Sequence, residues 1–165
     1  MKENTALYAF EKYGDTVLRA VYYYTGNMSE AEDITQDTFL KLHTSGQAFN
    51  DDEHLKAWLL RVSLNAGKNF FRSGRNRFNH PIDDVKENEI SEDFKFERNE
   101  ITDMIMKLPE KYKNVIFLYY FEDYSTKEIS EITEQKESTV RSLLKRGRDK
   151  LRLEMEDFNY EEARI

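Results

Sequence analysis

The sequence predicts an all-α protein built from two small helical domains, and three observations lead to this fold class. The 165 residues include only 6 Gly and 2 Pro, too few for the many turns of an all-β chain. Apolar residues recur at spacings of three and four, as in amphipathic helices. Between residues 79 and 97 this periodicity stops in a polar, acidic stretch, which we expect to be a flexible linker.

The expected domain boundaries follow from this linker. We place the first domain at residues 1–78, the linker at 79–97, the second domain at 98–157 and an acidic tail at 158–165. The alternative is a long surface loop within one domain, but structureless loops beyond about 15 residues are uncommon in compact domains. The expected helices span about residues 3–25, 29–44, 53–77, 98–107, 109–122, 125–133 and 137–156.

The absence of cysteine and of long apolar runs restricts the class of protein. Without cysteine the chain cannot form a disulfide framework or a zinc site built on thiolates. No run approaches the roughly 18 apolar residues of a membrane span, and residues 1–10 lack the pattern of a signal peptide. We therefore expect a cytoplasmic protein without a metal or other cofactor and without membrane insertion.

The charge is unevenly distributed along the chain. The net charge of -7, taken as an average, argues against a nucleic-acid partner. However, residues 54–80 hold six basic and no acidic side chains, and residues 136–152 hold seven basic and two acidic ones. Acidic residues dominate at 27–53, 83–103 and 153–165. Two basic segments within an acidic protein are typical of chains that contact a polyanion, although a solvated helix face can also be basic.

The helix expected at 29–44 carries an acidic face. Ser29 is its expected N-cap, with Glu32 completing a capping box three residues later. The face expected to be buried consists of Ala31, Ile34, Thr38 and Leu42. A second face consists of Asp33, Gln36, Asp37 and Leu40. Catalysis or metal binding would need a convergent histidine or third carboxylate, so we interpret this face as a solvated or partner-binding surface.

The helix expected at 53–77 combines an apolar and a cationic face. The apolar stripe consists of Leu55, Leu59, Val62, Ala66 and Phe70. The polar stripe consists of Arg61, Asn65, Lys68, Arg72 and Arg75, with Trp58 and Asn69 at its edge. Bases of melted DNA can stack on aromatic rings, while cations follow the phosphates and amides bond to base edges. The aromatic candidates are Trp58, Phe70, Phe71 and Phe78. The alternative is that these rings belong to the core and the cations only solvate the helix.

The second half of the chain has the layout of a helix-turn-helix. Pro109 suits the first turn of a helix whose broad apolar face consists of Val115, Ile116, Leu118, Tyr119 and Phe121. A short helix then begins with Ser125 as its cap and Glu128 three residues later. A turn at residues 134–136 leads to a basic helix, which in this motif enters the major groove.

The basic helix has a buried stripe and a polar face. The stripe consists of Val140, Leu143, Leu144, Gly147 and Leu151. A glycine inside a helix costs about 1 kcal/mol relative to alanine, so Gly147 predicts close approach of a neighbouring helix. The polar face consists of Ser138, Arg141, Ser142, Lys145, Asp149 and Arg152, and its first half is expected to contact bases and phosphates. The alternative is that it pairs with an acidic partner.

Together these segments resemble the extracytoplasmic-function (ECF) sigma factors, the smallest promoter-specificity subunits of bacterial RNA polymerase. AEDITQDTFLKLH is similar to the polymerase-docking helix of conserved region 2. HLKAWLLRVSLNAGKNFF is similar to the promoter-melting helix, whose pattern is met by Trp58, Leu59, Arg61, Asn65 and Asn69. The segments LPEKYKNVIFLYYFEDYSTKEISEI and STVRSLLKRGRDKL resemble conserved region 4.

The resemblance implies a role for each surface. The residues expected to dock on the clamp helices of the largest polymerase subunit are Asp33, Gln36, Asp37 and Leu40. Residues 49–54 would form the loop that captures a flipped minus-10 base. The residues expected to contact minus-10 DNA are Phe49, Asn50, Trp58, Arg61, Asn65, Lys68, Asn69, Arg72 and Arg75. Those expected to contact minus-35 DNA are Ser138, Thr139, Arg141, Ser142, Lys145 and Arg146.

The resemblance also implies partners. Residues 115–121 would help to seat region 4 on the flap of the second-largest polymerase subunit, and the linker would thread toward the RNA exit channel. A cognate anti-sigma factor is expected, and the free chain is expected to be a monomer without enzymatic activity.

Two other functions compete with this interpretation. A free-standing helix-turn-helix regulator would bind duplex DNA without polymerase, but it would not need the acidic face and the cationic, aromatic helix of the first half. A protein that binds acidic partners through its basic helices would explain neither the aromatic residues nor the helix-turn-helix.

Overall fold

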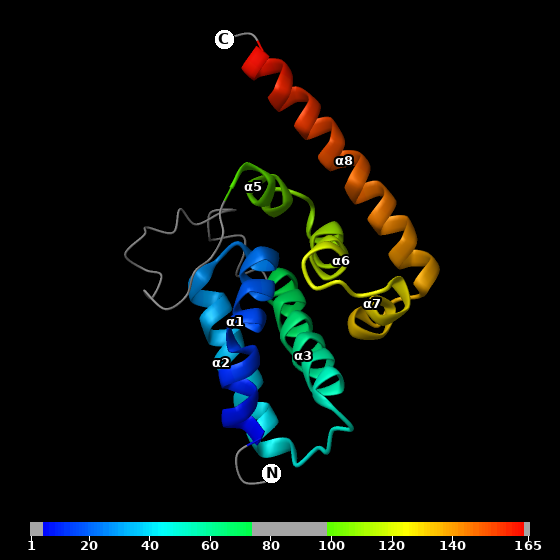
Figure 1. Ribbon diagram of the computed structural model, residues 1–165. Helices are drawn as coiled ribbons and strands as arrows, with labels where there is room; N and C mark the ends of the chain where they lie inside the picture. Colours follow the sequence, from blue (N-terminus) through cyan, green and yellow to red (C-terminus); the bar gives the residue numbers. More distant parts are fainter. Residues whose placement is uncertain (1–4, 74–98, 164–165) are drawn as a thin grey trace. The chain divides into compact units, whose positions relative to one another are not determined.

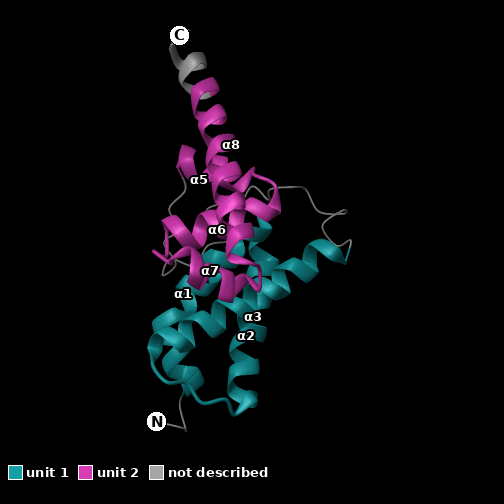
Figure 2. Ribbon diagram, turned by 90° about the vertical axis from the view of Figure 1, so that its right-hand side faces the viewer, with its two compact units in different colours: residues 1–96 teal, residues 97–165 magenta. Residues whose placement is uncertain are grey.

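The computed structural model describes residues 5–73 and 99–163, with side chains up to residue 157, and every regular element in these ranges is a helix. Two compact units divide the chain, unit 1 at residues 1–96 and unit 2 at residues 97–165 (Figure 2). The helices are α1 (Thr5–Thr25), α2 (Met28–Ser45), α3 (Asp52–Arg72), α5 (Glu100–Met106), α6 (Glu110–Tyr120), α7 (Thr126–Thr133) and α8 (Glu137–Ala163) (Figure 1). The predicted all-α class is confirmed.

Unit 1 is a three-helix assembly in which α1, α2 and α3 all pack against one another. Its core includes the fully buried Val17, Tyr22 and Leu59. At Gly67 the helices approach so closely that a Cβ atom would lie 2.7 Å from Cδ1 of Tyr24. Only glycine fits there without a shift of the tyrosine ring, so this position sets the spacing between α1 and α3.

The start of α2 differs from the sequence prediction. The helix begins at Met28, and Asn27 is the cap, since its side-chain oxygen accepts a 3.0 Å hydrogen bond from the Glu30 amide. Ser29 is therefore an exposed residue of the first turn rather than the cap. Gly26, at φ 69°, makes the preceding turn possible and brings Asn27 into place. The predicted inward face is confirmed, because all four of its members are buried: Ala31, Ile34, Thr38 and Leu42.

Unit 2 packs α6, α7 and α8 together, with α5 against α6 and α8. Val115, Ile116 and Leu118 of α6 are buried as predicted. The apolar face is narrower than expected, because Tyr119 and Phe121 are 36% and 40% exposed. Pro109 stands at the N-cap position, one residue before the first turn of α6.

The helix-turn-helix is formed by α7 and α8. Ser125 caps α7 as predicted: its hydroxyl accepts a 3.1 Å bond from the Glu128 amide, and its own amide donates to the Glu128 carboxylate at 2.8 Å. The helix ends at Thr133, and the C-cap residue Glu134 adopts the left-handed conformation with φ 55°. A Cβ atom at Gly147 would lie 3.1 Å from the Ile116 side chain, which confirms the predicted close approach of a neighbouring helix.

Several predictions concern residues outside the described ranges, namely the expected linker at 79–97, Arg75 and Phe78. The final helix, α8, continues to Ala163, seven residues beyond its expected end at 156. No helix in the described part of the chain is long and apolar enough to cross a membrane.

Candidate nucleic-acid interface

The polar stripe of α3 is presented on the surface of unit 1. Asn65, Lys68, Asn69 and Arg72 are exposed, and Arg61 is half-buried. Of the predicted apolar stripe, Leu55, Leu59 and Phe70 are buried, while Val62 and Ala66 are only half-buried. The face that packs against α1 and α2 also includes Leu60, Ser63 and Leu64, which are buried. Sequence periodicity missed these three residues because α3 contacts two helices rather than one. The result is one outward face that carries cations and amides without an acidic side chain.

Aromatic residues near this stripe serve mainly as core. Phe70 is fully buried, and the Phe71 ring contacts both Phe70 and Tyr24 edge to face. Trp58 is only 8% exposed, and its ring lies 5.8 Å from that of Phe49. The core interpretation therefore holds for both Phe70 and Trp58, and the buried Trp58 pairs with Phe49 where the loop at 46–51 meets α3.

Of the residues expected to form the base-capturing loop, 49–54, only 49–51 lie in the loop at 46–51, because α3 already begins at Asp52. Short contacts connect this loop to the first turn of α3. Asp51 caps the helix, since its carboxylate accepts a 2.8 Å hydrogen bond from the His54 amide. The His54 ring lies 5.2 Å from Phe49, and its Nδ1 accepts a 3.3 Å bond from the Asn50 amide. Phe49 and Asn50 therefore both contact His54, whose backbone amide donates to the Asp51 cap.

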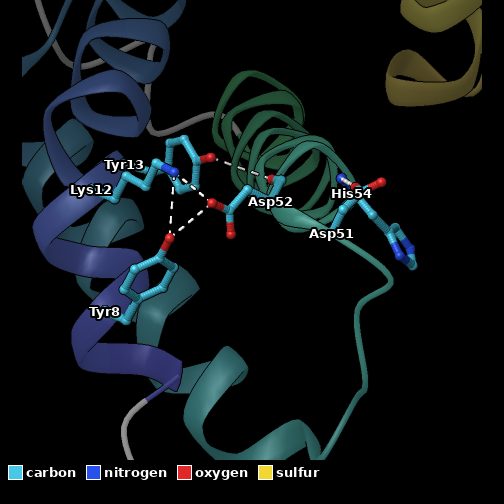
Figure 3. Close-up of polar contacts among 6 residues, drawn as sticks. All are labelled: Tyr8, Lys12, Tyr13, Asp51, Asp52 and His54. Atoms are coloured by element: carbon cyan, nitrogen blue, oxygen red, sulfur yellow. Dashed lines mark hydrogen bonds and ion pairs between the residues drawn. The ribbon is translucent and has the colours of Figure 1, made fainter. Parts of the chain in front are cut away.

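A polar cluster not predicted from the sequence ties α1 to the same turn (Figure 3). The Asp52 carboxylate, at the start of α3, accepts hydrogen bonds from the Lys12 ammonium and, at 2.8 Å, from the Tyr8 hydroxyl. The bond to Lys12 lowers the pKa of Asp52 and raises the pKa of Lys12. Tyr8 and Lys12 are spaced by one helical turn, which is visible in the sequence, but their partner lies more than 35 residues away.

The acidic face of α2 is exposed throughout, with Asp33, Gln36 and Asp37 all facing solvent. Leu40 is 61% exposed, an unusual position for leucine on a helix whose neighbours Phe39 and Leu42 are buried. No group of three His, Cys, Asp or Glu side chains among the described residues could hold a metal ion. The predicted acidic face of α2 is therefore a solvent-exposed surface that also carries one large apolar side chain.

In unit 2, the first half of α8 carries the predicted polar face. All six candidates are exposed: Ser138, Thr139, Arg141, Ser142, Lys145 and Arg146. The Arg141 guanidinium pairs with the Glu137 carboxylate at 3.2 Å. The same Glu137 oxygen accepts a 3.0 Å bond from the Thr126 hydroxyl, which joins the first turns of α7 and α8.

Two further features of α6 and the residue after it were missed by sequence reasoning, namely exposed aromatic side chains and a buried lysine. Tyr119, Tyr120 and Phe121 are exposed, although the Phe121 ring stacks on that of the buried Phe117. The Arg148 guanidinium donates a 3.4 Å hydrogen bond to the Tyr120 hydroxyl, which raises the pKa of Arg148. Lys113 is buried, and burial lowers its pKa to about 8. A lysine within an apolar face has no sequence signal that distinguishes it from an exposed one.

Comparisons with known proteins agree with this division. A model of Sigma-70 region 2 matches residues 9–77, and a model of Sigma-70 region 4 matches residues 98–151. The chain is 29% identical to the ECF RNA polymerase sigma factor SigW of Bacillus subtilis (strain 168), covering 88% of this chain and 86% of the relative. It is 27% identical to the ECF RNA polymerase sigma factor SigM of the same organism, covering 87% and 90%.

Solved structures share the fold. The sigma factor RpoE in complex with the anti-sigma factor NepR from Bartonella quintana matches with a TM-score of 0.70 and 17% identity, over 93% of this chain and 98% of that one. CnrH in complex with the cytosolic domain of CnrY matches with a TM-score of 0.65 and 19% identity, over 92% and 88%.

Proposed function

Because the chain belongs to the ECF-type sigma-70 family, a non-enzymatic class of transcription initiation factors with regions 2 and 4, we propose that it directs bacterial core RNA polymerase to promoters. In this proposal it binds the core enzyme, recognises minus-35 and minus-10 elements and assists DNA melting in the cytoplasm. The observation that carries the proposal is the pairing, within unit 1, of an exposed acid-and-leucine face on α2 with an acid-free cationic face on α3.

Unit 1 would contact the melted minus-10 element. Asn65, Lys68, Asn69 and Arg72 present two amides and two cations on one exposed face of α3. Amides bond to the edges of unpaired bases, and cations follow the phosphates of a single strand. Arg61 would extend this phosphate track at one end. Arg75, which lies outside the described residues, is proposed as a further phosphate contact. Phe49 and Asn50, with the edge of Trp58 behind them, would receive the flipped base.

Unit 2 would bind the minus-35 element as duplex. The exposed side chains of the first half of α8 would enter the major groove, as the second helix of a helix-turn-helix does. Arg141 would read a base edge, because a guanidinium pairs with guanine in two places. Ser138, Thr139 and Ser142 would add shorter contacts, and Lys145 and Arg146 would bind phosphates.

Docking on the core enzyme would use the acidic face of α2. Asp33 and Asp37 would pair with basic side chains of the clamp helices, Gln36 would bond between them, and Leu40 would fill an apolar pocket. Tyr119, Tyr120 and Phe121, which are exposed at the end of α6, would help to seat region 4 on the flap. Large apolar and aromatic side chains are typical of the buried core of protein–protein interfaces.

A cognate anti-sigma factor would cover the same surfaces. The two similar structures with TM-scores of 0.70 and 0.65 are each bound to another protein, an anti-sigma factor in the first case. By the shared fold we extend this kind of partner to the present chain. Such a partner would keep an otherwise monomeric chain away from the core enzyme until it is released.

The proposal is tested by mixing the purified chain with bacterial core RNA polymerase and measuring complex formation by native electrophoresis. We expect one complex with wild-type protein and a loss of affinity of at least tenfold for Leu40→Ala. The matched control is Leu153→Ala on α8, since Leu153 is 62% exposed and Leu40 61%. Failure of the wild-type chain to bind the core enzyme would contradict the proposal.

The helix-turn-helix by itself also supports a free-standing duplex-binding regulator. Gel shifts with promoter-containing duplex distinguish the two functions. Tight, sequence-specific binding by the free chain at low salt, without polymerase, would favour the regulator. Specific binding only in the presence of the core enzyme would favour the sigma factor.

A further inference from the structure

We propose that Tyr8, Lys12 and Asp52 form a positioning cluster that holds the loop at residues 46–51 and thereby sets how strictly that loop selects its base. The inference rests on the proposed function, since it assigns a role to residues behind the loop expected to capture a minus-10 base. None of the three touches DNA in this proposal. They act by fixing the turn from which the loop emerges.

The geometry of the cluster is focused on one oxygen atom. Lys12 and the Tyr8 hydroxyl both donate to Oδ2 of Asp52, and Lys12 also bonds to the Tyr8 hydroxyl at 3.3 Å (Figure 3). Tyr8 and Lys12 lie one turn apart on α1, so a rigid helix presents both donors together. Tyr13, next to Lys12, donates to the backbone carbonyl of Asp52 at 3.4 Å. Three side chains of α1 thus converge on the first residue of α3.

A continuous series of contacts leads from this residue to the loop. Asp51, directly before Asp52, accepts the His54 amide and so caps α3. Nδ1 of His54 accepts a hydrogen bond from the backbone amide of Asn50, and the His54 ring also contacts the Phe49 ring. Phe49 in turn meets Trp58 one turn further along α3. A displacement of the first turn of α3 would therefore move Asn50 and Phe49 with it.

The cluster is poorly suited to a purely stabilising role. The Lys12 and Asp52 side chains are 45% and 40% exposed, and exposed ion pairs contribute little to folding. The core of unit 1, including the close contact at Gly67, already fixes α1 against α3 away from this end. Base selection by hydrogen bonds, in contrast, depends steeply on distance and angle. Small shifts at this turn would change selectivity before they change stability.

The test is a selection with holoenzyme assembled from the full chain and bacterial core polymerase. The probe is a pool of single-stranded DNA oligonucleotides randomised over ten positions, and sequencing of the bound fraction gives the base preference at each position. Asp52→Asn keeps the size of the side chain and removes its charge. Tyr8→Phe removes one donor only. Lys12→Met removes the ammonium, and Lys12→Arg restores a cation.

The matched control is Glu11→Gln, which removes an exposed carboxylate charge from α1 one residue away from Lys12. We expect the strongest base preference to fall at least threefold in Asp52→Asn and Lys12→Met, and less in Tyr8→Phe. Glu11→Gln should match wild type, and Lys12→Arg should recover most of the preference. Thermal midpoints and core affinity should stay unchanged in all five.

Three results would overturn the inference. An undiminished preference in both Asp52→Asn and Lys12→Met would remove the positioning role and leave the proposed function intact. A lowered preference accompanied by an equal loss of core affinity or thermal midpoint in every cluster variant would reduce the cluster to a structural tie. A wild-type holoenzyme with no preference at any position would instead contradict the proposed function, and the inference with it.

Discussion

In unit 1 the first turn of α3 bonds to side chains that lie 40 and 44 residues earlier, whereas in unit 2 the bonds that open α7 join residues only three apart. The side-chain bond between α7 and α8, from Thr126 to Glu137, spans 11 residues. The helix-turn-helix of unit 2 is therefore specified largely by local sequence. The first turn of α3 in unit 1 has a local cap as well, but its position also depends on how α1 packs against it.

The first prediction compares the two glycines that bring helices together. Gly67→Ala should destabilise unit 1 by about 2–3 kcal/mol, because the new methyl group meets the buried ring of Tyr24 at 2.7 Å. Gly147→Ala should change the stability of unit 2 by less than about 1 kcal/mol, since Ile116 at 3.1 Å needs to move by much less than Tyr24 does and alanine favours a helix.

Urea unfolding of the full chain separates these two effects. Trp58 is the only tryptophan and lies in unit 1, so its fluorescence follows unit 1, while circular dichroism follows both units. An unchanged fluorescence transition in Gly67→Ala would contradict the predicted clash. A larger loss of stability in Gly147→Ala than in Gly67→Ala would show that Ile116 yields less readily than Tyr24.

The second prediction concerns base reading by α8. Arg141→Ala should weaken minus-35 binding of the holoenzyme by about 1–3 kcal/mol at one base pair and relax selection there. Lys145→Ala should weaken binding to all sequences alike, as loss of a phosphate contact does. Both effects are measured by competition binding. The competitors are single-base variants of a duplex that the wild-type holoenzyme selects. Equal loss on every variant for Arg141→Ala would reassign Arg141 to the phosphates.

The third prediction is a pH effect confined to unit 2. Below pH 8 the Lys113 ammonium is protonated in both the folded and the unfolded chain. The folded chain must then bury a charge, so Lys113 lowers the free energy of unfolding most in this pH range. Lys113→Met should therefore raise the free energy of unfolding of unit 2 by about 1–2 kcal/mol at pH 7. This gain is smaller than the cost of burying an isolated ammonium, because Glu110 attracts the charge. The gain should shrink as pH rises from about 8 to 10.5.

Circular dichroism during urea unfolding at several pH values tests this dependence. A gain that stays constant across the range would mean that Lys113 has an ordinary pKa in the folded chain. The fluorescence transition of Trp58 in unit 1 serves as the internal control and should not respond to the substitution.

The fourth prediction compares two serines expected to be caps from the sequence. Ser125→Ala should cost about 1 kcal/mol, because it removes the bond to the Glu128 amide. Ser29→Ala should cost less than about 0.5 kcal/mol, since Asn27 caps α2. Thermal unfolding of the two variants measures both losses of stability. A larger loss of stability for Ser29→Ala than for Ser125→Ala would show that Asn27 is wrongly assigned as the cap of α2.

The smallest expected effect is that of Asp52→Asn on stability. Its thermal midpoint at neutral pH should equal that of wild type, because the ion pair with Lys12 is exposed. The lowered pKa of Asp52 means that any contribution of the charged pair is present above the ordinary aspartate pKa and is lost as the solution becomes more acidic. A clearly lower midpoint at neutral pH would indicate a structural role.

The parts of the fold that the sequence predicted are those set by near neighbours. Ser125 and Glu128 form a capping box within one turn, and the burial of Gly147 follows from the period of its own helix. Asn27 displaced Ser29 as cap because the left-handed Gly26 before it could not be inferred from spacing. The hydrogen bonds of Asp52 could not be predicted from local spacing, because their donors Tyr8 and Lys12 lie on α1.

For the candidate site, the sequence located the exposed stripes of α2, α3 and α8 but not their surroundings. Helical periodicity is enough to place Lys68 or Arg141 on an outer face. It does not tell how far a neighbouring helix covers a ring, so Trp58 is more enclosed and Tyr119 more open than their positions on a wheel suggest.

The contact of Gly147 with Ile116 fixes the angular phase of α8 as well as its distance from α6. Each residue of a helix advances the side chains by about 100°. One residue inserted between Arg146 and Gly147 would turn every earlier side chain of α8 by about 100° relative to Gly147. Val140, Leu143 and Leu144 would then leave the buried face of the helix. The polar face that holds Arg141 would point elsewhere, although α8 would keep all of its charges.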